Sequence, residues 1–482
     1  MAHKVLILAQ GDAWRWCVNE HRRPFLDTPK HLLKIDGETL LDRARRLFTD
    51  AGCEVVVLGP QLPGYMPCIT LKNPFPTGTE QDKFLGSQKQ WSQSGRTIIT
   101  WGDCFYTRAA VKTITGHDSD DLHYFRRPGP SKITGHKWDE SFAVSFGPHE
   151  HKRVIEIARQ VVAKVKSGVV RKDHIRTHYA QSLNLHNIDS IPHVAGTPGQ
   201  THINDWSDDF DNPSECVRWM GRYYNGKVKV AVCMPWRNGD KFRNEAKDHV
   251  VRYYKQFAPV FMGTAPGKFF NRSAAKNAAV RAALEAIPDC KALFFADSDT
   301  FVGEEQFWAA AYLASTMDRM ILAYDNYIRL DQRATAMILK GKMTSHGRVW
   351  PLHASGALAV SVDLWKKTGG FDERFPSWGA EDRAFYCACN TIAGYPDAVN
   401  LPGDCYHLYH PATVEKKKGL PEYQANVALG MRYKHAAGWS PQMGCLPETA
   451  KSKPNLKEML ALLKEPGGPL DDNYKSVGVP LV

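Results

Sequence analysis

The sequence lacks a long hydrophobic run. No apolar segment approaches the length that a helix needs to cross a bilayer, and residues 1–4 lead directly into a strand-like run without the apolar core of a signal peptide. These absences exclude an integral membrane enzyme with helical spans. We therefore expect no membrane span and a cytoplasmic protein.

Cysteines are few and have no metal-ligand spacing. The chain has 11, an odd number, and only Cys387, Cys389 and Cys405 come near to forming a cluster. This distribution argues against a disulfide framework and against a structural zinc site, and buried thiols are the simpler interpretation. A reducing compartment is the expected setting.

The charges include no long block of one sign. The 62 Lys and Arg residues exceed the 51 Asp and Glu residues by 11, and apart from residues 416–418 they are spread along the chain. Two interpretations remain open. The excess suits a polyanionic acceptor such as DNA, and it equally suits an enzyme that handles charged nucleotide donors.

Two segments resemble the first strand of an α/β domain. At 482 residues, 43% of them hydrophobic, the chain is long for one core. Residues 4–10 and residues 227–235 each open an alternation of apolar strands and helical stretches, which predicts α/β architecture with a mainly parallel sheet. We place one domain at residues 1–225, a second at 226–465, and a loosely ordered tail at 466–482.

The most informative motif of the second half follows residues 291–296, an apolar run that predicts a buried strand. Asp297 and Asp299 come directly after it, and carboxylates at this spacing point the same way from the edge of a sheet. Such a pair can bind a hard divalent cation. Asp is also an ordinary strand-ending residue, so the pair alone does not establish a metal site.

A second string, residues 371–382, adds an acidic pair beside an aromatic residue. Glu381 and Asp382 stand at the start of a predicted helix, shortly after Trp378. The helix dipole favours negative charge at this position, which explains one carboxylate without any catalytic role. The alternative is a general base that removes a proton from an acceptor.

With both strings, residues 228–412 resemble the GT-A glycosyltransferases, in particular family 2 enzymes, polypeptide N-acetylgalactosaminyltransferases and the C-terminal region of β-1,4-galactosyltransferases. The resemblance implies transfer of a sugar from a nucleoside-diphosphate sugar with the help of Mn²⁺ or Mg²⁺. It implies a metal site at Asp299 and His407, a base at Asp382 and a hydroxyl-binding role for Glu381. It also implies donor contacts from Arg237, Asn277, Asp297, Gly356, Trp378 and His410. A capped, alanine-rich helix around Asn277 would need no ligand, and this alternative stays open.

The first half carries a separate phosphate-binding pattern. A strand leads into Gly11, with Arg15 and Lys30 following, and another predicted strand ends at Gly102 and Asp103. A glycine loop between a strand and a helix presents backbone amides to phosphate. The carboxyl edge of a parallel sheet is where ligands bind in open α/β folds.

On these residues the first half resembles the MobA-like and sugar-phosphate nucleotidyltransferases, which share a related nucleotide-diphospho-sugar fold. The resemblance implies that Gly11 and Arg15 hold nucleotide phosphates, that Lys30 stabilises the attacked phosphate, and that Asp103 and Asp211 bind Mg²⁺. The chain departs from that family at the loop. Ala13 stands where the family has its second loop glycine, and the bulky Trp14 and Trp16 stand where small residues are usual.

The two resemblances together predict an α/β chain with two Rossmann-like nucleotide-diphospho-sugar transferase (GT-A type) domains in tandem. The leading hypothesis is a bifunctional enzyme that makes an NDP-sugar from an NTP and a sugar-1-phosphate and then transfers the sugar to a protein or glycan acceptor. One alternative is a single glycosyltransferase with a non-catalytic N-terminal binding module. Another is a glycosyltransferase that acts on modified DNA bases.

Overall fold

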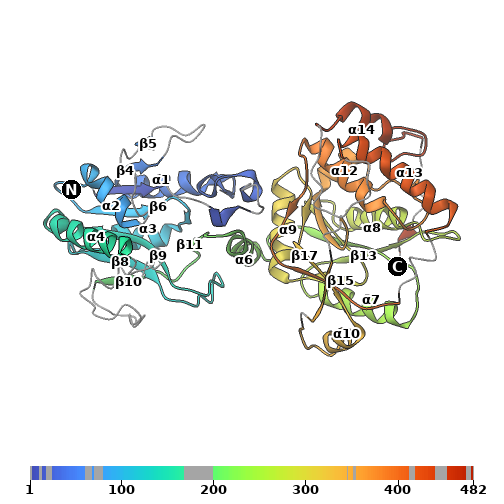
Figure 1. Ribbon diagram of the computed structural model, residues 1–482, viewed down its shortest axis with the longest axis horizontal. Helices are drawn as coiled ribbons and strands as arrows, with labels where there is room; N and C mark the ends of the chain where they lie inside the picture. Colours follow the sequence, from blue (N-terminus) through green and yellow to red (C-terminus); the bar gives the residue numbers. More distant parts are fainter. Residues whose placement is uncertain are drawn as a thin grey trace. The chain divides into compact units, whose positions relative to one another are not determined.

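The computed structural model describes residues 3–9, 14–17, 24–59, 68–69, 80–167, 199–344, 346–350, 354–411, 418–439, 453–473 and 479–480. The chain divides into two compact units, Met1–Trp219 and Met220–Val482. Each unit contains its own mixed α/β sheet with parallel central strands (Figure 1). The division falls within helix α6 (Pro213–Tyr223), shortly before the boundary expected at residue 225.

The N-terminal unit is built on a seven-stranded sheet. Its strands, in spatial order, are β10 (Gln200–His202), β8 (His123–Arg127), β9 (Glu140–Phe146), β6 (Thr97–Trp101), β1 (Lys4–Leu8), β4 (Glu54–Leu58) and β5 (Cys68–Ile69). Strand β9 runs antiparallel to both of its neighbours, and the other pairings are parallel.

Helices cover both faces of this sheet because its strands are apolar on both sides. Val5 and Ile7 face one core with helices α1 (Leu40–Asp50) and α3 (Arg108–Thr115). Leu6 and Leu8 face a second core with α2 (Glu80–Ser87) and α4 (His151–Lys166). Successive strand residues point to opposite faces, so one apolar run supplies both cores.

The C-terminal unit also contains a seven-stranded sheet. Its order is β20 (Val399–Asn400), β16 (Ile321–Leu322), β19 (Ala357–Ser361), β14 (Ala292–Ala296), β12 (Val230–Pro235), β13 (Val260–Thr264) and β22 (Val479–Pro480). Strand β19 runs antiparallel to β14 and β16. Strand β22 pairs antiparallel with β13, so part of the expected loose tail is anchored in the sheet.

Aromatic residues of β14 connect this sheet to helices on its two faces. Phe294 packs against Tyr254 of α7 (Lys241–Tyr254) and Phe307 of α9 (Glu304–Thr316). Phe295, on the opposite face, packs against Phe385 of α12 (Glu381–Ala393). The other α-helices of the unit are α8 (Arg272–Ala286), α10 (Gln332–Leu339), α11 (Val362–Thr368), α13 (Pro421–Ala436) and α14 (Leu456–Leu463).

Smaller sheets and short helices complete the described structure. In the C-terminal unit a four-stranded sheet has the order β15 (Thr300–Val302), β21 (Asp404–His407), β17 (Asn326–Leu330) and β18 (Gly347–Trp350). The N-terminal unit has the pairs β7 (Cys104–Phe105) with β11 (Asp208–Asp209), and β2 (Lys34–Ile35) with β3 (Glu38–Thr39). Its 3₁₀ helices are η1 (Trp14–Trp16), η2 (Phe25–Asp27), η3 (Lys30–Leu32), η4 (Gln88–Gln90) and η5 (Pro148–Glu150).

Apart from their edge strands, the two large sheets share a core of five strands in the same order, from β8 to β4 in one and from β16 to β13 in the other. In each, the first strand (β1 or β12) lies between two parallel neighbours, and the next strand outward (β9 or β19) is antiparallel. The order differs in direction only at one edge, where β5 is parallel and β22 antiparallel. The acidic turns after β6 and β14 therefore occupy equivalent positions in the two sheets.

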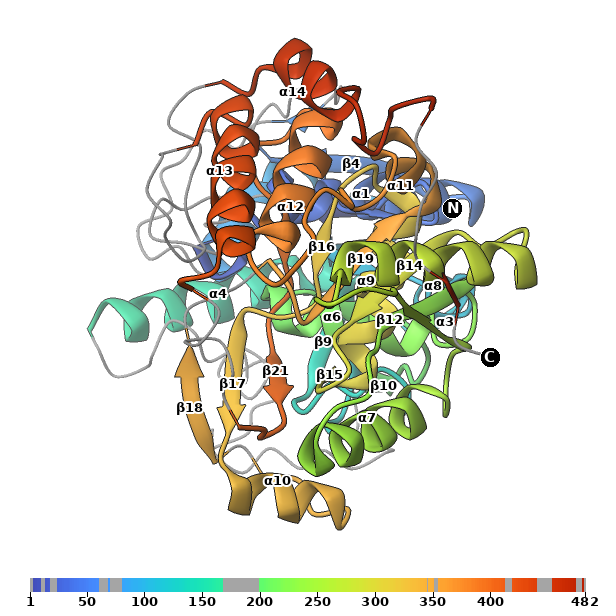
Figure 2. The ribbon, with the colours of Figure 1, turned by 90° about the vertical axis from the view of Figure 1, so that its right-hand side faces the viewer.

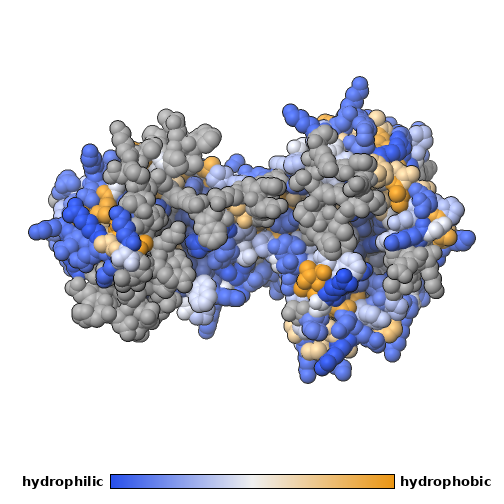
Figure 3. All heavy atoms as spheres, viewed as in Figure 1, coloured by the Kyte–Doolittle hydropathy of each residue, from blue (hydrophilic) through white to orange (hydrophobic). Residues whose placement is uncertain are grey.

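The surface is mostly hydrophilic on the face shown in Figure 3. No helix within the described residues is long and apolar enough to span a membrane. The described cysteines form no disulfide, and all of them except Cys17 are buried.

Candidate functional site

The acidic turn after β14 is fixed by backbone contacts on both sides. The Asp297 amide and the Thr300 hydroxyl both donate to the carbonyl of Gly356, at 3.0 and 2.5 Å. The Leu408 amide donates to the Asp299 carbonyl at 2.8 Å. These contacts hold the turn against the antiparallel strand β19 and against the segment that follows β21.

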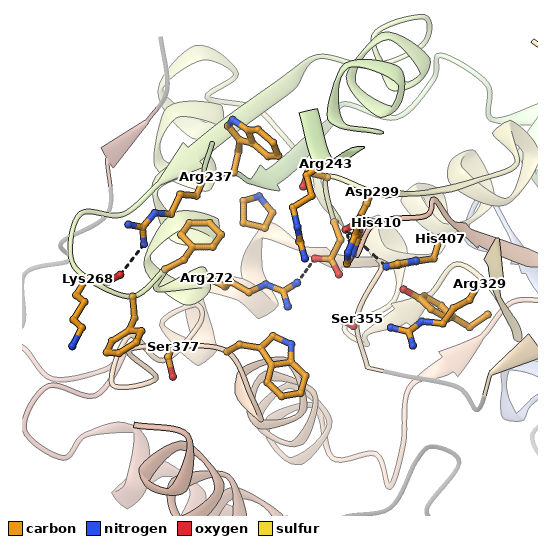
Figure 4. A pocket seen from close by; sticks show the side chains of 18 residues that line it. Arg237, Arg243, Lys268, Arg272, Asp299, Arg329, Ser355, Ser377, His407 and His410 are labelled. Carbon is orange, nitrogen blue, oxygen red and sulfur yellow. Dashed lines mark hydrogen bonds and ion pairs between the residues drawn. The ribbon is translucent and has the colours of Figure 1, made fainter. Parts of the chain in front are cut away.

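Asp299 meets two histidines from the end of β21. Its Oδ2 lies 3.1 Å from His410 Nε2 and 3.8 Å from His407 Nε2 (Figure 4). In the sheet, Thr300 pairs with His407, so the strand after the acidic turn brings the histidine to it. The three side chains offer ligand atoms within 4.8 Å of one another, which fits a divalent cation. His410, expected as a diphosphate contact, is thus nearer to Asp299 than His407 is.

The protonation states of this cluster suit ligands. Burial lowers the pKa of His407, which favours the neutral imidazole that binds metals. Burial raises the pKa of Asp299, but His407, His410 and Arg272 together lower it below the ordinary range. The carboxylate is therefore ionised at neutral pH.

Arg272, at the start of α8, connects the acidic turn to the acidic pair of α12. Its guanidinium lies 2.5 Å from Asp297, 3.2 Å from Glu381 and 3.9 Å from Asp382. Burial lowers its pKa, but the three carboxylates raise it well above the ordinary value. One cation thereby fixes the relative positions of the two sequence motifs.

The acidic pair lies at an unusual helix start. Ala380 precedes α12 with φ +68°, a left-handed conformation that non-glycine residues rarely adopt. The Gly379 amide donates to Glu381 at 2.9 Å, and Lys276 of α8 pairs with Asp382. Burial, followed by the neighbouring Asp382, raises the pKa of Glu381. The pair does more than cap a helix, because charged groups of α8 hold both carboxylates in place.

Two adjoining cavities open at these residues. One of about 530 Å³ contains the Asp299 cluster, and the other, of about 250 Å³, is lined by Glu381 and Asp382. Both are lined by Arg272, Ser355 and Trp378. Trp378 lies at the junction and stacks on Tyr423, with ring centroids 5.7 Å apart and planes at 11°.

Two other predicted donor residues, Arg237 and Asn277, differ in whether they line a cavity. Arg237 lines the larger cavity and donates to the carbonyls of Gly267 and Lys268 at 3.2 and 3.4 Å. Asn277 does not line either cavity. It is buried, accepts from the Phe371 amide at 2.9 Å and donates to Glu373 at 2.9 Å.

The Asn277 side chain thus fixes the turn that precedes the acidic pair, and its donor contact stays a prediction. Gly356 also has a structural role, beside the predicted approach to the donor. Its φ is +95°, and an added Cβ would lie 3.0 Å from the Tyr327 ring. Its carbonyl supports the Asp297 turn, so it acts on the site through the backbone.

Sequence reasoning missed Lys276 and Arg272 as organisers of the site. Lys276 is only 2% exposed and sits over the Phe371 ring at 4.6 Å as well as beside Asp382. Basic residues in an alanine-rich helix give no sign of burial. The available signal was the spacing of four residues between Arg272 and Lys276, which places them on one helix face.

In the N-terminal unit, Lys30 lies among carboxylates. Its Nζ is 2.5 Å from Asp103 and 3.6 Å from Asp211, and Arg15 reaches Asp211 at 2.9 Å. Four of the predicted residues thus come together, while Gly11 lies outside the described residues. Trp16, whose bulk departs from the nucleotidyltransferase pattern, is buried and donates from its indole to the Thr28 carbonyl at 2.8 Å.

Asp209 is a carboxylate of this site that the sequence did not indicate. It pairs with Cys104 across β7 and β11, and with Asp103 and Cys104 it offers ligand atoms within 4.8 Å of one another. Burial, followed by Asp103 and Asp211, raises the pKa of Asp209. Burial lowers the pKa of Lys30, but Asp103, Asp209 and Asp211 raise it above its ordinary value. The acidic set therefore requires a cation, and Lys30 supplies one.

No family model and no curated protein matches the chain. Among solved structures, it is similar to the inositol-1-phosphate CTP transferase from T. maritima, with 14% identity, 44% of this chain and 91% of that chain covered, and a TM-score of 0.29. It is also similar to a hypothetical transferase from Thermus thermophilus, with 16% identity, 35% of this chain and 74% of that chain covered, and a TM-score of 0.26. A third similar structure is a UDP-glucose pyrophosphorylase complexed with UDP-glucose, with 10% identity, 33% of this chain and 80% of that chain covered, and a TM-score of 0.25. TM-scores this low do not establish a shared fold.

Proposed function

We propose that the chain is a bifunctional enzyme whose C-terminal unit is a metal-dependent glycosyltransferase of GT-A type and whose N-terminal unit makes the NDP-sugar. One observation carries the proposal. The Asp299 cluster and the Glu381–Asp382 pair line adjoining cavities that share Arg272, Ser355 and Trp378. A donor diphosphate and an acceptor can therefore approach each other from two sides.

The residues at the first cavity fit a divalent cation. Asp299 offers a carboxylate oxygen, and His407 and His410 offer imidazole nitrogens. Nitrogen ligands favour Mn²⁺ over Mg²⁺, which prefers oxygen. When bound, the ion would neutralise charge on the leaving nucleoside diphosphate. Arg237 and Arg243 line the same cavity and add positive charge there.

The second cavity suits activation of an acceptor hydroxyl. The acceptor oxygen bonds to the anomeric carbon, the bond from that carbon to the diphosphate breaks, and its electron pair stays on the phosphate oxygen. Asp382 takes the hydroxyl proton. Lys276 and Arg272 orient Asp382, and Glu381 lies beside it as the partner for a sugar hydroxyl.

The N-terminal unit supports the first step of the pathway. The oxygen of a sugar-1-phosphate attacks the α-phosphorus of an NTP, and pyrophosphate leaves with the electron pair of the broken bond. Lys30 and Arg15 would bind the phosphates, while Asp103, Asp209 and Asp211 would hold Mg²⁺. The cluster fits such an ion because its half-buried acidic groups lie close together and already attract the Lys30 cation.

The proposal is tested by two assays on the purified full chain. Incubation with NTPs and a panel of sugar-1-phosphates, with and without Mg²⁺, should release pyrophosphate. Incubation with a panel of NDP-sugars and Mn²⁺ should release nucleoside diphosphate by slow donor hydrolysis. Asp209→Asn should abolish the first reaction and leave the second unchanged.

A second candidate function has a specific observation in its favour. Lys30 forms close ion pairs with the acids that would hold the metal, and the bulky Trp16 is buried against Phe25. Both features suit an N-terminal module that binds but does not catalyse. Donor hydrolysis without pyrophosphate release from any NTP and sugar-phosphate pair would establish this single-activity alternative.

A further inference from the structure

The four-stranded sheet of the C-terminal unit extends from the candidate metal cluster to an exposed edge. Arg329 of β17 pairs with His407 on one side and with Arg348 of β18 on the other. Residues paired across neighbouring strands point to the same face. At about 4.8 Å per strand, Arg348 lies roughly 10 Å from His407. Figure 2 shows β21, β17 and β18 side by side, with β18 outermost.

A second cross-strand pair on the same face of the sheet also runs from the cavity toward β18. Tyr327, two residues from Arg329, pairs with Trp350 of β18. Tyr327 and Arg329 both line the larger cavity. Arg348 and Trp350 therefore continue the wall of that cavity out to the edge of the sheet. We call Arg329, Arg348 and Trp350 the basic ribbon.

Among the residues that the structure describes, no carboxylate forms an ion pair with Arg329 or Arg348 of the basic ribbon. Arg329 and Arg348 are exposed and directly opposite each other, and like charges in this position destabilise a strand pair. Both guanidinium groups lie over the Trp350 ring, at 4.5 and 5.0 Å from its centroid. The arrangement is thus suited to an external anion.

The surroundings are basic and apolar together. Residues 326–350 contain five Lys and Arg residues and one acid, Asp331. Val349 and Met343 are 62% and 67% exposed. The charge of Arg348 keeps this edge strand from pairing with another strand, and the two exposed apolar side chains offer contact area near that charge.

We propose that the acceptor of the sugar is carried on a nucleic-acid strand that binds the basic ribbon, an inference that rests on the proposed glycosyltransferase function. Arg329 and Arg348 bind phosphates of the strand, because the planar guanidinium matches the oxygens of a phosphate. A base of the strand stacks on Trp350 or on a guanidinium plane that already lies over its ring, as bases do in proteins that bind single strands. The combination of paired guanidinium groups with an aromatic ring favours a nucleic acid over an acidic peptide.

The ribbon delivers the strand to the cavities. A hydroxyl of a base or of a sugar in the strand supplies the attacking oxygen, and its proton passes to Asp382. The new bond joins that oxygen to the anomeric carbon as the nucleoside diphosphate leaves. The strand and the NDP-sugar are thus the only reactants, and the nucleoside diphosphate is the leaving group.

Fluorescence anisotropy on the full chain tests the proposal with two labelled probes. One is a thymidine oligonucleotide of about 20 nucleotides, long enough to cover a typical single-strand site. The other is an abasic oligonucleotide of the same length and charge. The thymidine probe should bind about tenfold more tightly, and both affinities should fall as salt rises.

Matched variants locate the binding surface. Arg348→Glu should weaken both probes about tenfold, because it removes a phosphate contact and adds repulsion. Trp350→Ala should abolish the preference for the thymidine probe. Lys457→Glu, a charge reversal at an exposed position on α14, should leave both affinities unchanged.

Equal binding of the two probes, or binding that neither ribbon variant alters, would overturn the proposal. Donor hydrolysis measured on the same samples separates it from the proposed function. Hydrolysis without ribbon-dependent binding rejects the nucleic-acid acceptor alone. Ribbon-dependent binding without hydrolysis of any NDP-sugar rejects the glycosyltransferase, and the acceptor role with it.

Discussion

In the N-terminal unit the acidic turn after β6 is paired with a lysine, whereas in the C-terminal unit the equivalent turn after β14 faces two histidines. In both units the residue directly after the acidic turn begins a short strand that pairs with a late strand of the same unit. Cys104, directly after Asp103, pairs with Asp209, and Thr300, directly after Asp299, pairs with His407. In each unit a late strand therefore brings one candidate ligand to the acidic turn.

The difference lies in the charge of that late ligand. A second carboxylate in the N-terminal unit makes the cluster strongly negative, and Lys30 compensates for it. Imidazoles in the C-terminal unit leave a nearly balanced cluster, so α8 directs its buried cations toward Asp297 and Asp382 instead. Two sheets of similar topology can thus carry sites that differ in how much they depend on a bound cation.

The largest expected effect comes from removing one acidic residue from either of the two sites. Asp299→Ala should lower sugar transfer by roughly 10⁴-fold, because the diphosphate loses a metal ligand, and should leave pyrophosphate release unchanged. Asp103→Ala should do the reverse. Initial rates of both reactions, measured on each variant, check this expectation. Equal loss of both activities in either variant would break the comparison, since the sites would not be independent.

The next effect concerns the acidic pair, which has no counterpart in the proposed mechanism of the N-terminal unit. Asp382→Asn should reduce transfer by roughly 10²- to 10³-fold, because the acceptor loses its base. Donor binding should be nearly unchanged, as measured by calorimetry with an NDP-sugar and Mn²⁺.

Glu381→Gln is the matched control for this experiment. It preserves the size of the neighbouring side chain and should reduce transfer much less than Asp382→Asn. A collapse of transfer in Glu381→Gln alone would reverse the two assignments. If both variants keep full activity, the pair only begins a helix.

A third prediction tests whether Lys30 balances the negative charge of the N-terminal cluster. Lys30→Met should destabilise the chain by about 3 kcal/mol, because it leaves Asp103, Asp209 and Asp211 without their cation. Added Mg²⁺ should raise the melting temperature of this variant more than that of the wild type. Lys112→Met, at an exposed position on α3, is the control and should behave like the wild type. If Mg²⁺ raises the melting temperature of this variant no more than that of the wild type, Lys30 does not stand in for a bound metal ion.

The smallest effect is a pH dependence of stability in the N-terminal unit. His136 lies 2.8 Å from Glu140 and 3.1 Å from Asp208, whose carboxylate also pairs with Arg127. Burial lowers the pKa of His136, but Asp208 and Glu140 raise it to about 9. Burial raises the pKa of Glu140 to about 7, against the opposing effect of His136.

Both shifts predict a stability that falls as pH rises, for Glu140 from its ordinary pKa up to about 7 and for His136 from about 6.5 up to about 9. The contribution of His136 is complete below its unfolded value of about 6.5 and disappears as pH rises through about 9. The unfavourable ionisation of Glu140 near pH 7 acts in the same direction. The melting temperature should fall over this range by a few degrees more in the wild type than in His136→Gln, as followed by circular dichroism. Parallel pH profiles would exclude the network as the cause.

The sequence by itself determined where the acidic turns lie. Apolar runs at 97–101 and 292–296 were expected to be strands, and they form β6 and β14. Because a buried strand must end at the sheet edge, Asp103, Asp297 and Asp299 follow from local pattern alone. The two α/β units follow in the same way from two separate alternations of strands and helices.

Tertiary structure alone decided which partners these carboxylates have. Asp209, Lys276 and Arg348 reach their sites through strand pairing or helix packing across long stretches of chain, and no local pattern encodes such pairing. The same holds for Asn277, whose amide completes the hydrogen bonds of a distant turn. Local sequence fixes the periodicity of an element, whereas the charge that a side chain meets depends on which elements pack beside it.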